Sequence, residues 1–219
     1  MARVLPAVAA SIPAAAEVFR TGGIVIFPTE TVYGIGADLH NSEGVRRLFA
    51  VKLRAINQPL LVHCCNMRQL AELVTDVPVF ARRLMHRFWP GPLSLVFKKH
   101  PSVPTLVTAG RDTVGIRMVA HDFTCAVIGQ LNSPIAGTSA NYSGRPATAC
   151  FCRLDPDIVN QVDLAIDAGE CGTGFPSTVL DVSVDPPVLI REGAVSLSEL
   201  APYLGSRTVR QNQARPAEP

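Results

Sequence analysis

The chain has 219 residues, of which 47% are hydrophobic and 17% are charged, and its formal net charge is +2. This length and apolar content suffice for one large domain, or two small ones, with a substantial core. The small net charge argues against a protein that coats nucleic acid through bulk electrostatics, so an anion-binding site has to be local. No apolar run of the sequence is as long as a membrane span.

The predicted elements begin at the N-terminus, where Pro6 and Pro13 interrupt an alanine-rich apolar stretch. This pattern favours a first strand and a helix over a secretion signal. The elements expected further on are a strand at 23–27, a helix at 41–51, a strand at 60–63, helices at 67–74 and 78–88, strands at 94–97 and 113–119, a helix at 122–131, strands at 133–138, 162–166 and 177–182, and a helix at 197–204.

Strands and helices therefore alternate without strict βαβ regularity. This predicts an α/β fold, a single domain with a twisted mixed β-sheet flanked by helices, over residues 1–205. Residues 206–219 are polar and aperiodic, and we expect a disordered tail or the start of a linker there.

The six cysteines do not form a disulfide framework or a CxxC zinc motif. Cys64 and Cys65 are adjacent, and a single residue separates Cys150 from Cys152. The expected state is reduced thiols in a cytoplasmic protein.

PTETVYGIGAD (residues 28–38) places the hydroxyls of Thr29 and Thr31 directly after a strand. Gly34 and Gly36 would let the backbone approach a ligand, although a glycine-rich turn explains the same letters. The segment is not a Walker loop, because GxxxxGK[ST] does not occur in the chain.

KLRAINQPLLVH (residues 52–63) carries two cations, Lys52 and Arg54, and no Asp or Glu occurs from Val45 to His63. If the helix ends in a turn here, both cations can reach one polyanion. The guanidinium of Arg can bind two phosphate oxygens at once, and Lys supplies a compact charge. A solvated helix end is the alternative. His63, at the end of an apolar strand, fits a hydrogen-bonded core histidine.

Three further segments carry polar groups at strand ends. Arg117 lies between Ile116 and Met118 and needs an anionic partner, either a ligand or an internal carboxylate. GTSANYSGRPAT (137–148) is a polar loop after an apolar strand, where α/β proteins bind small ligands, although an ordinary loop has the same composition. GFPSTVLDV and VLIREG (174–182 and 188–193) add hydroxyls and an arginine at strand ends.

Taken in order, PTETVYGIG, KxR followed by PLLVH, WPGPLS, TVGIR, SANYSG and STVLD with LIREG resemble the YrdC-like threonylcarbamoyl-AMP synthase family over roughly residues 15–205. The resemblance implies a concave, positively lined cavity. It also implies a nucleotidyltransferase that makes threonylcarbamoyl-AMP and pyrophosphate from L-threonine, bicarbonate or CO2, and ATP. The product would serve N6-threonylcarbamoyladenosine modification at position 37 of tRNA.

The resemblance also assigns residues. Those that match L-threonine positions are Thr31, His63, Arg117, Gly137 and Ser177, and those that match ATP positions are Lys52, Arg54, Gln58, Thr113, Ser139, Asn141, Ala147 and Arg191. Mg2+ is expected to bind through the ATP phosphates without protein ligands. No protein nucleophile is expected: Lys52 and Arg54 would stabilise the phosphates, and His63 is a candidate for deprotonating the threonine amine.

The chain departs from the family pattern at Ala55, Gln58, Val119 and Thr138, where many relatives have other residues. Larger relatives add a linker, whose tyrosine reaches the active site, and a second domain. Tyr203 is not expected to take that role. The family likeness further implies a downstream tRNA-modification transferase complex, weak tRNA binding and no membrane association.

Two alternatives remain from the sequence. One is an RNA-binding module that holds tRNA or double-stranded RNA on a basic concave surface, against which the small net charge argues. The other is a carbamoyl-adenylate former resembling hydrogenase-maturation carbamoyltransferases, which carry zinc-finger and acylphosphatase modules that this sequence lacks.

Overall fold

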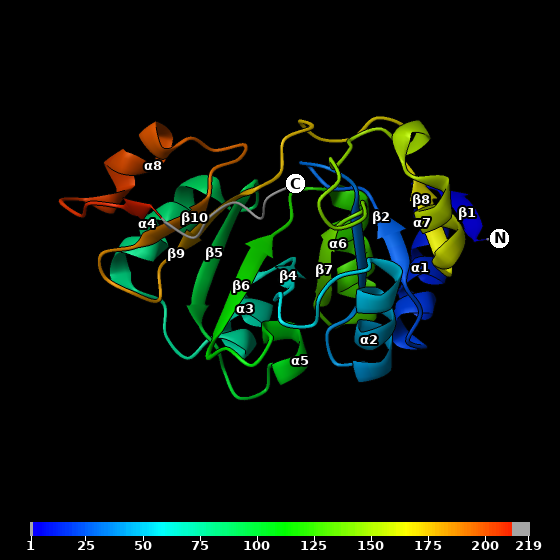
Figure 1. The fold of residues 1–219 in the computed structure, drawn as a ribbon, viewed down its shortest axis with the longest axis horizontal. Helices are drawn as coiled ribbons and strands as arrows, with labels where there is room; N and C mark the ends of the chain where they lie inside the picture. The colour runs from blue at the N-terminus through cyan, green and yellow to red at the C-terminus, as the bar shows by residue number, and fades with distance from the viewer. Residues whose placement is uncertain (1, 212–219) are drawn as a thin grey trace.

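A computed structural model describes residues 2–211. Within that range eleven strands form one mixed sheet in the order β1-β8-β2-β3-β7-β4-β6-β5-β9-β10-β11. Figure 1 shows β1 and β8 at one end of this sheet and β9, β10 and helix α8 at the other. The α/β class and the twisted mixed sheet predicted from the sequence are therefore confirmed.

The strands are β1 (Arg3–Pro6), β2 (Val25–Phe27), β3 (Gly34–Asp38), β4 (Leu61–Cys64), β5 (Leu93–Lys98), β6 (Thr113–Met118), β7 (Ile135–Ser139), β8 (Leu164–Asp167), β9 (Thr178–Asp181), β10 (Val188–Arg191) and β11 (Arg210–Gln211). The helices are α1 (Ile12–Arg20), α2 (Ser42–Val51), α3 (Met67–Leu73), α4 (Val79–Phe88), α5 (Thr105–Thr108), α6 (Asp122–Leu131), α7 (Pro156–Gln161) and α8 (Leu197–Leu204), with short 3-10 turns η1 (Ala9–Ser11) and η2 (Phe151–Arg153).

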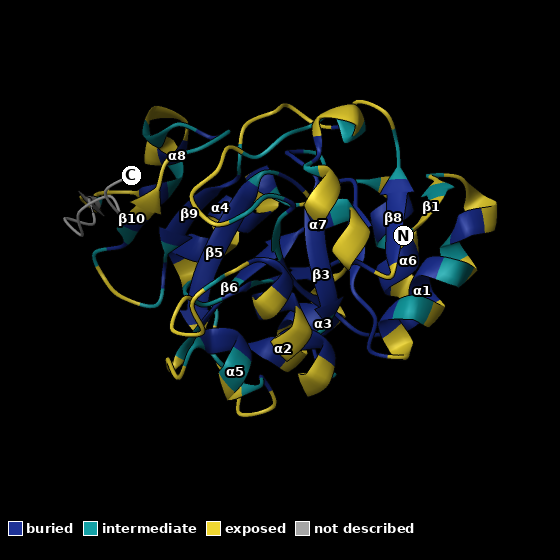
Figure 2. Cartoon of the chain, turned by 45° about the vertical axis from the view of Figure 1, so that its right-hand side comes forward, coloured by how far each residue is buried: buried dark blue, intermediate teal, exposed yellow. Residues whose placement is uncertain are grey.

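Two apolar clusters hold the helices on the sheet. In the smaller cluster α1 and α6 pack on Val25, Phe27 and Ile135 of the strands. In the larger cluster α2, α3 and α4 pack on other strand residues, such as Ile26 and Ile116. Val25 and Phe27 therefore face one helix layer and Ile26 the other, as alternation along a strand requires. Figure 2 shows buried strands enclosed by helices whose outer faces are exposed.

Strand β3 is an element that the sequence did not predict. It pairs antiparallel with both β2 and β7, in the middle of the sheet. Its glycines serve this packing: a Cβ on Gly34 would lie 2.7 Å from the Phe27 ring, and one on Gly36 would lie 2.7 Å from the Ala136 carbonyl oxygen. The interpretation of the segment as a turn is therefore wrong, and the two glycines make room for neighbouring residues of the sheet.

The first residues beyond 205 continue along the sheet. Arg207 forms an ion pair with Asp185 and lies over the Phe80 ring, and β11 pairs parallel with β10. Residues 212–219, the greater part of the predicted tail, lie outside the described residues. None of the helices between residues 2 and 211 combines the length and apolar character that a membrane crossing requires.

Candidate functional site

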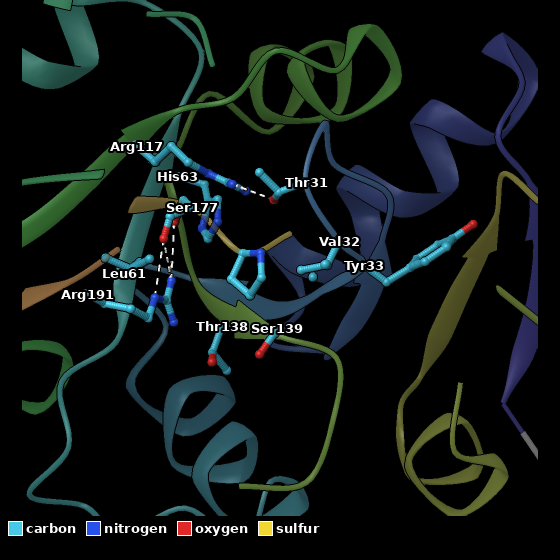
Figure 3. A pocket seen from close by; sticks show the side chains of 12 residues that line it. Thr31, Val32, Tyr33, Leu61, His63, Arg117, Thr138, Ser139, Ser177 and Arg191 are labelled. Atoms are coloured by element: carbon cyan, nitrogen blue, oxygen red, sulfur yellow. Dashed lines mark hydrogen bonds between the residues drawn. The ribbon is translucent and has the colours of Figure 1, made fainter. Parts of the chain in front are cut away.

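Two adjoining cavities open at the centre of the sheet. The smaller, of about 70 Å³, has residues of β4, β6 and β7 and the segment before β9 in its wall (Figure 3). The larger, of about 570 Å³, extends past the end of α2 and the loop after β7. Leu61, Thr138, Ser139 and Arg191 line both cavities. Ligands in the two cavities would therefore lie next to each other.

Arg117 is the buried cation of the smaller cavity. The parallel pairing of β4 with β6 places it beside His63, and Arg117 is only 4% exposed. Its Nη1 donates to Thr31 Oγ1 at 2.6 Å and lies 3.4 Å from Glu30 Oε1. Burial lowers the pKa of Arg117, and the charge of Glu30 opposes that shift.

Glu30 is the internal carboxylate that pairs with Arg117, and no role was expected for it from the sequence. Its Oε2 accepts the Ala120 N–H at 3.2 Å, whereas Oε1 and Arg117 Nε are buried without hydrogen-bond partners. The ion pair thus leaves the guanidinium with donor capacity for a second carboxylate. The position of this acid between Thr29 and Thr31, directly after a strand, is the feature of the sequence from which its role could have been predicted.

Ser177 and Arg191 close the smaller cavity on the side of β9. Ser177 Oγ lies 2.9 Å from the Oγ of Ser94, a fully buried residue, and Arg191 Nη2 donates to the Ser177 carbonyl at 2.8 Å. Burial, and then repulsion from Arg117, lowers the pKa of Arg191. Figure 3 shows Arg117 directed at Thr31 and Arg191 at Ser177, while the Tyr33 side chain points away.

His63 is buried and neutral. Burial, assisted by the charge of Arg117, lowers its pKa to about 3. Its ring packs edge-on to Phe27 with centroids 5.8 Å apart, and its Nδ1 has no hydrogen-bond partner. The expectation of a hydrogen-bonded core histidine is therefore incomplete: the ring is buried, but one nitrogen remains free beside the cavity.

Lys52 lies at the end of α2, where the chain turns sharply. Leu53 adopts a left-handed φ of 48°, a conformation that non-glycine residues rarely take, and this turn brings Lys52 and Arg54 to one cavity. Lys52 is 1% exposed, and its Nζ donates to the carbonyls of Ser139, at 2.6 Å, and Asn141. The alternative of a solvated helix end is therefore wrong for Lys52.

The larger cavity is cationic. Lys52, Arg54, Arg111 and Arg191 line it, against the single carboxylate of Asp181. Burial and the neighbouring Arg54 lower the pKa of Lys52 to about 7. The pKa of Arg54 is lowered by burial and by Arg191. These mutually repelling cations favour an anionic ligand.

The structure brings most of the predicted site residues together. The smaller cavity is lined by Thr31, His63, Arg117 and Ser177, and the larger by Lys52, Arg54, Gln58, Thr113, Ser139, Asn141 and Arg191. Gly137 lines the larger cavity, on the side of His63, and Ala147 lines neither.

The departures from the family pattern fall in different places. Gln58 and Thr138 line the larger cavity, Ala55 does not, and Val119 is buried in the core. Tyr203 lies on α8 with its ring against Phe88 and lines neither cavity.

No group of three or more His, Cys, Asp or Glu side chains that could hold a metal ion occurs among residues 2–211. The cationic cavity, with Asp181 as its carboxylate, does not fit a protein-held Mg2+ site.

Known protein families and structures match the part of the chain that carries these site residues. The Sua5_yciO_yrdC family model, described as "Telomere recombination", matches residues 17–193. The threonylcarbamoyl-AMP synthase of Pyrococcus abyssi is 41% identical over 191 residues, which are 87% of this chain and 56% of that protein. That of Bacillus subtilis is 38% identical over 192 residues, again 87% and 56% of the two chains.

A solved structure of that family has the same fold. The crystal structure of P. abyssi Sua5 complexed with L-threonine matches with a TM-score of 0.89 at 38% identity, over 96% of this chain and 62% of that one. The chain spans about half the length of the two synthases it matches, 56% of each.

Proposed function

The chain belongs to the Sua5/YciO/YrdC family, and on that premise we propose that it is an L-threonylcarbamoyladenylate synthase, a nucleotidyltransferase of tRNA modification. Its substrates would be L-threonine, bicarbonate or CO2, and ATP, and its products threonylcarbamoyl-AMP and pyrophosphate. The observation that carries the proposal is the pair of adjoining cavities. One is built around a buried arginine with unused donors, and the other around four cations.

In the smaller cavity Arg117 would bind the carboxylate of L-threonine. Its guanidinium is held by Thr31 and Glu30, and these contacts leave donors of the arginine unused, so Arg117 can pair with a second carboxylate. Thr31 and Ser177 would hold the rest of the amino acid, with their hydroxyls fixed by Arg117 and Ser94. The P. abyssi protein, which was solved with L-threonine, supports L-threonine as the ligand.

In the larger cavity Lys52, Arg54 and Arg191 would bind the phosphates. Lys52 already holds the carbonyls of Ser139 and Asn141, and the loop after β7 is thereby kept in place for the nucleotide. Lining residues such as Gln58 and Thr113 would complete the ATP site.

The reaction needs no protein nucleophile. The neutral threonine amine would add to CO2 and lose a proton to water, which gives a carbamate. A carbamate oxygen would then attack the α-phosphorus, and the bond to the leaving pyrophosphate would break. The protein's contribution would be positioning in adjoining cavities and stabilisation of the departing negative charge by Lys52 and Arg54. His63 is a poor candidate for general base, because a group with a pKa of about 3 cannot readily take a proton from an ammonium.

Mg2+ belongs to the proposal only as an ion carried by the ATP phosphates, and no step is assigned to it. A tRNA-modification transferase would consume the product. The cytoplasm, where ATP and tRNA occur together, is the compartment that we propose for this role.

The test is pyrophosphate release from ATP, with L-threonine and bicarbonate each omitted in turn. We expect release only when both are present. Arg54→Ala and Ser139→Ala should each lower turnover at subsaturating ATP by roughly tenfold to a hundredfold, because the first removes a phosphate contact and the second removes a hydroxyl from the wall of the ATP cavity. Arg46→Ala is the matched control, since Arg46 is exposed on α2. ATP hydrolysis that is independent of threonine would refute the assignment, and RNA binding would be tested next.

A further inference from the structure

Cys150 and Cys152 form a thiol pair at the surface, outside the two cavities described above. They flank Phe151 at the start of η2, and their Sγ atoms lie 2.6 Å apart. Cys152 is exposed and Cys150 is partly exposed. The half-buried thiols elsewhere bond to other groups: Cys125 Sγ donates to the Val119 carbonyl and Cys65 Sγ to Gln69.

The backbone holds this pair in place from both sides. The Cys150 N–H donates to Thr148 Oγ1 at 3.0 Å, and the Phe151 N–H donates to the Gly169 carbonyl at 2.9 Å. Cys150 also forms an antiparallel bridge with Glu170. These contacts hold the backbone of Cys150 and Phe151, and the two sulfurs lie against each other on it, which favours a reaction between them.

The two thiols are chemically unequal. The hydrogen bond from Cys152 is the main cause that lowers the pKa of Cys150, and Arg153 lowers it further. The same hydrogen bond raises the pKa of Cys152. Because the thiolate is the nucleophile, Cys150 should react first and Cys152 should resolve the product.

We propose that Cys150 and Cys152 are a reversible thiol–disulfide site, oxidised by hydroperoxides and reduced by small dithiols. The Cys150 thiolate attacks a peroxide oxygen and becomes a sulfenic acid, with release of water or an alcohol. The Cys152 thiol then attacks that sulfur and displaces water. In sum two thiols lose two electrons and two protons, and the peroxide is reduced.

The thiol pair lies near the candidate ATP site but not in it. Cys152 lines a surface cavity of about 440 Å³ together with Asn141, and Asn141 also lines the cationic cavity. The thiol pair therefore lies next to the loop after β7. The inference itself does not rest on the proposed function, because its test reads the sulfur chemistry directly.

The experiment treats the reduced, purified protein with hydrogen peroxide, blocks free thiols with N-ethylmaleimide, and maps the digest by mass spectrometry. Chymotryptic cleavage after Phe151 separates the two cysteines, so a disulfide appears as a linked pair of peptides. We expect this link to form, to disappear with dithiothreitol, and to leave the other four thiols free for labelling.

Variants separate the two roles. Cys152→Ser should stop Cys150 at a sulfenic acid that dimedone traps, and Cys150→Ser should leave Cys152 reduced. Cys65→Ser is the control and should leave the link unchanged. The proposal is overturned if peroxide leaves both thiols free for alkylation in the unmutated chain, if Cys150 links to the neighbouring Cys171 instead, or if both cysteines form sulfinic acids without a link.

Discussion

Lys52 is the residue whose charge state should report on nucleotide binding. Its pKa is lowered to about 7, so at pH 8 the free protein holds it mostly neutral. A bound triphosphate favours the ammonium form and raises that pKa, and binding at pH 8 should therefore take up a proton. At pH 6 the lysine is already charged, and the uptake should vanish.

Calorimetry of ATP binding in two buffers with different ionisation heats measures this uptake. Lys52→Arg is the informative variant, because arginine stays charged at both pH values and should abolish the effect. Uptake at pH 8 that persists in Lys52→Arg would assign the proton to another group.

Glu30 should matter for stability as the counter-ion of Arg117. Glu30→Gln removes its charge while the buried cation remains, and breaking a buried ion pair typically costs about 3–5 kcal/mol. We expect the low end, roughly 3 kcal/mol, because the Glu30 side chain is 15% exposed. Urea unfolding measures the loss, and saturating L-threonine should recover part of it by supplying a carboxylate.

The control for this change is Glu17→Gln. Glu17 pairs with Arg20 at the surface, where an ion pair contributes about 0–1 kcal/mol. Equal stability of Glu30→Gln and Glu17→Gln would show that the buried Arg117 does not need Glu30 as its counter-ion.

At the scale of elements, β3 packs so closely on its neighbours that only glycine fits at Gly36. A Cβ on Gly36 would meet Ile135 Cγ2 at 2.6 Å and the Ala136 carbonyl oxygen at 2.7 Å. Gly36→Ala should therefore destabilise the fold by about 1–3 kcal/mol, as overpacking usually does. Thermal or urea unfolding measures the change.

Gly129 provides the matched control. It lies in α6, is exposed, and has open space where a Cβ would go. Gly129→Ala should stabilise by about 0.5–1 kcal/mol, because alanine favours the helix. A neutral Gly36→Ala beside a stabilised Gly129→Ala would contradict the packing role of β3.

Elements with a local signature were predicted well, and those without one were not. The expected helix at 41–51 is α2, capped by the Asn41 side chain on the Gly44 N–H. The strands at 94–97 and 113–119 correspond to β5 and β6. β3 was missed because its glycines resemble a turn, and its pairing with β2 and β7 lies outside its own sequence. The short α5 and α7 were missed as well.

At the scale of the whole molecule, a net charge of +2 coexists with a strongly cationic cavity. ATP affinity should therefore fall as salt rises, because screening acts over about 10 Å at 0.1 M and the cavity is open to solvent. Stability should change little over the same range, since most ion pairs of the described residues lie at the surface. Titration of ATP at several KCl concentrations checks this. An ATP affinity that does not change with salt would contradict the phosphate role of the cations.

The sequence by itself predicted most of the elements, the family and a set of candidate site residues that the fold brings to the two cavities. Amphipathic periods, caps and the uncompensated Lys52 and Arg54 are properties of neighbouring residues, and they can be read without the fold. Only the tertiary structure decided the contacts that hold the site: Arg117 with Thr31, Lys52 with Ser139 and Ser94 with Ser177 join residues 86, 87 and 83 positions apart. The sheet order brings these partners together, and no local pattern encodes which distant strands become neighbours.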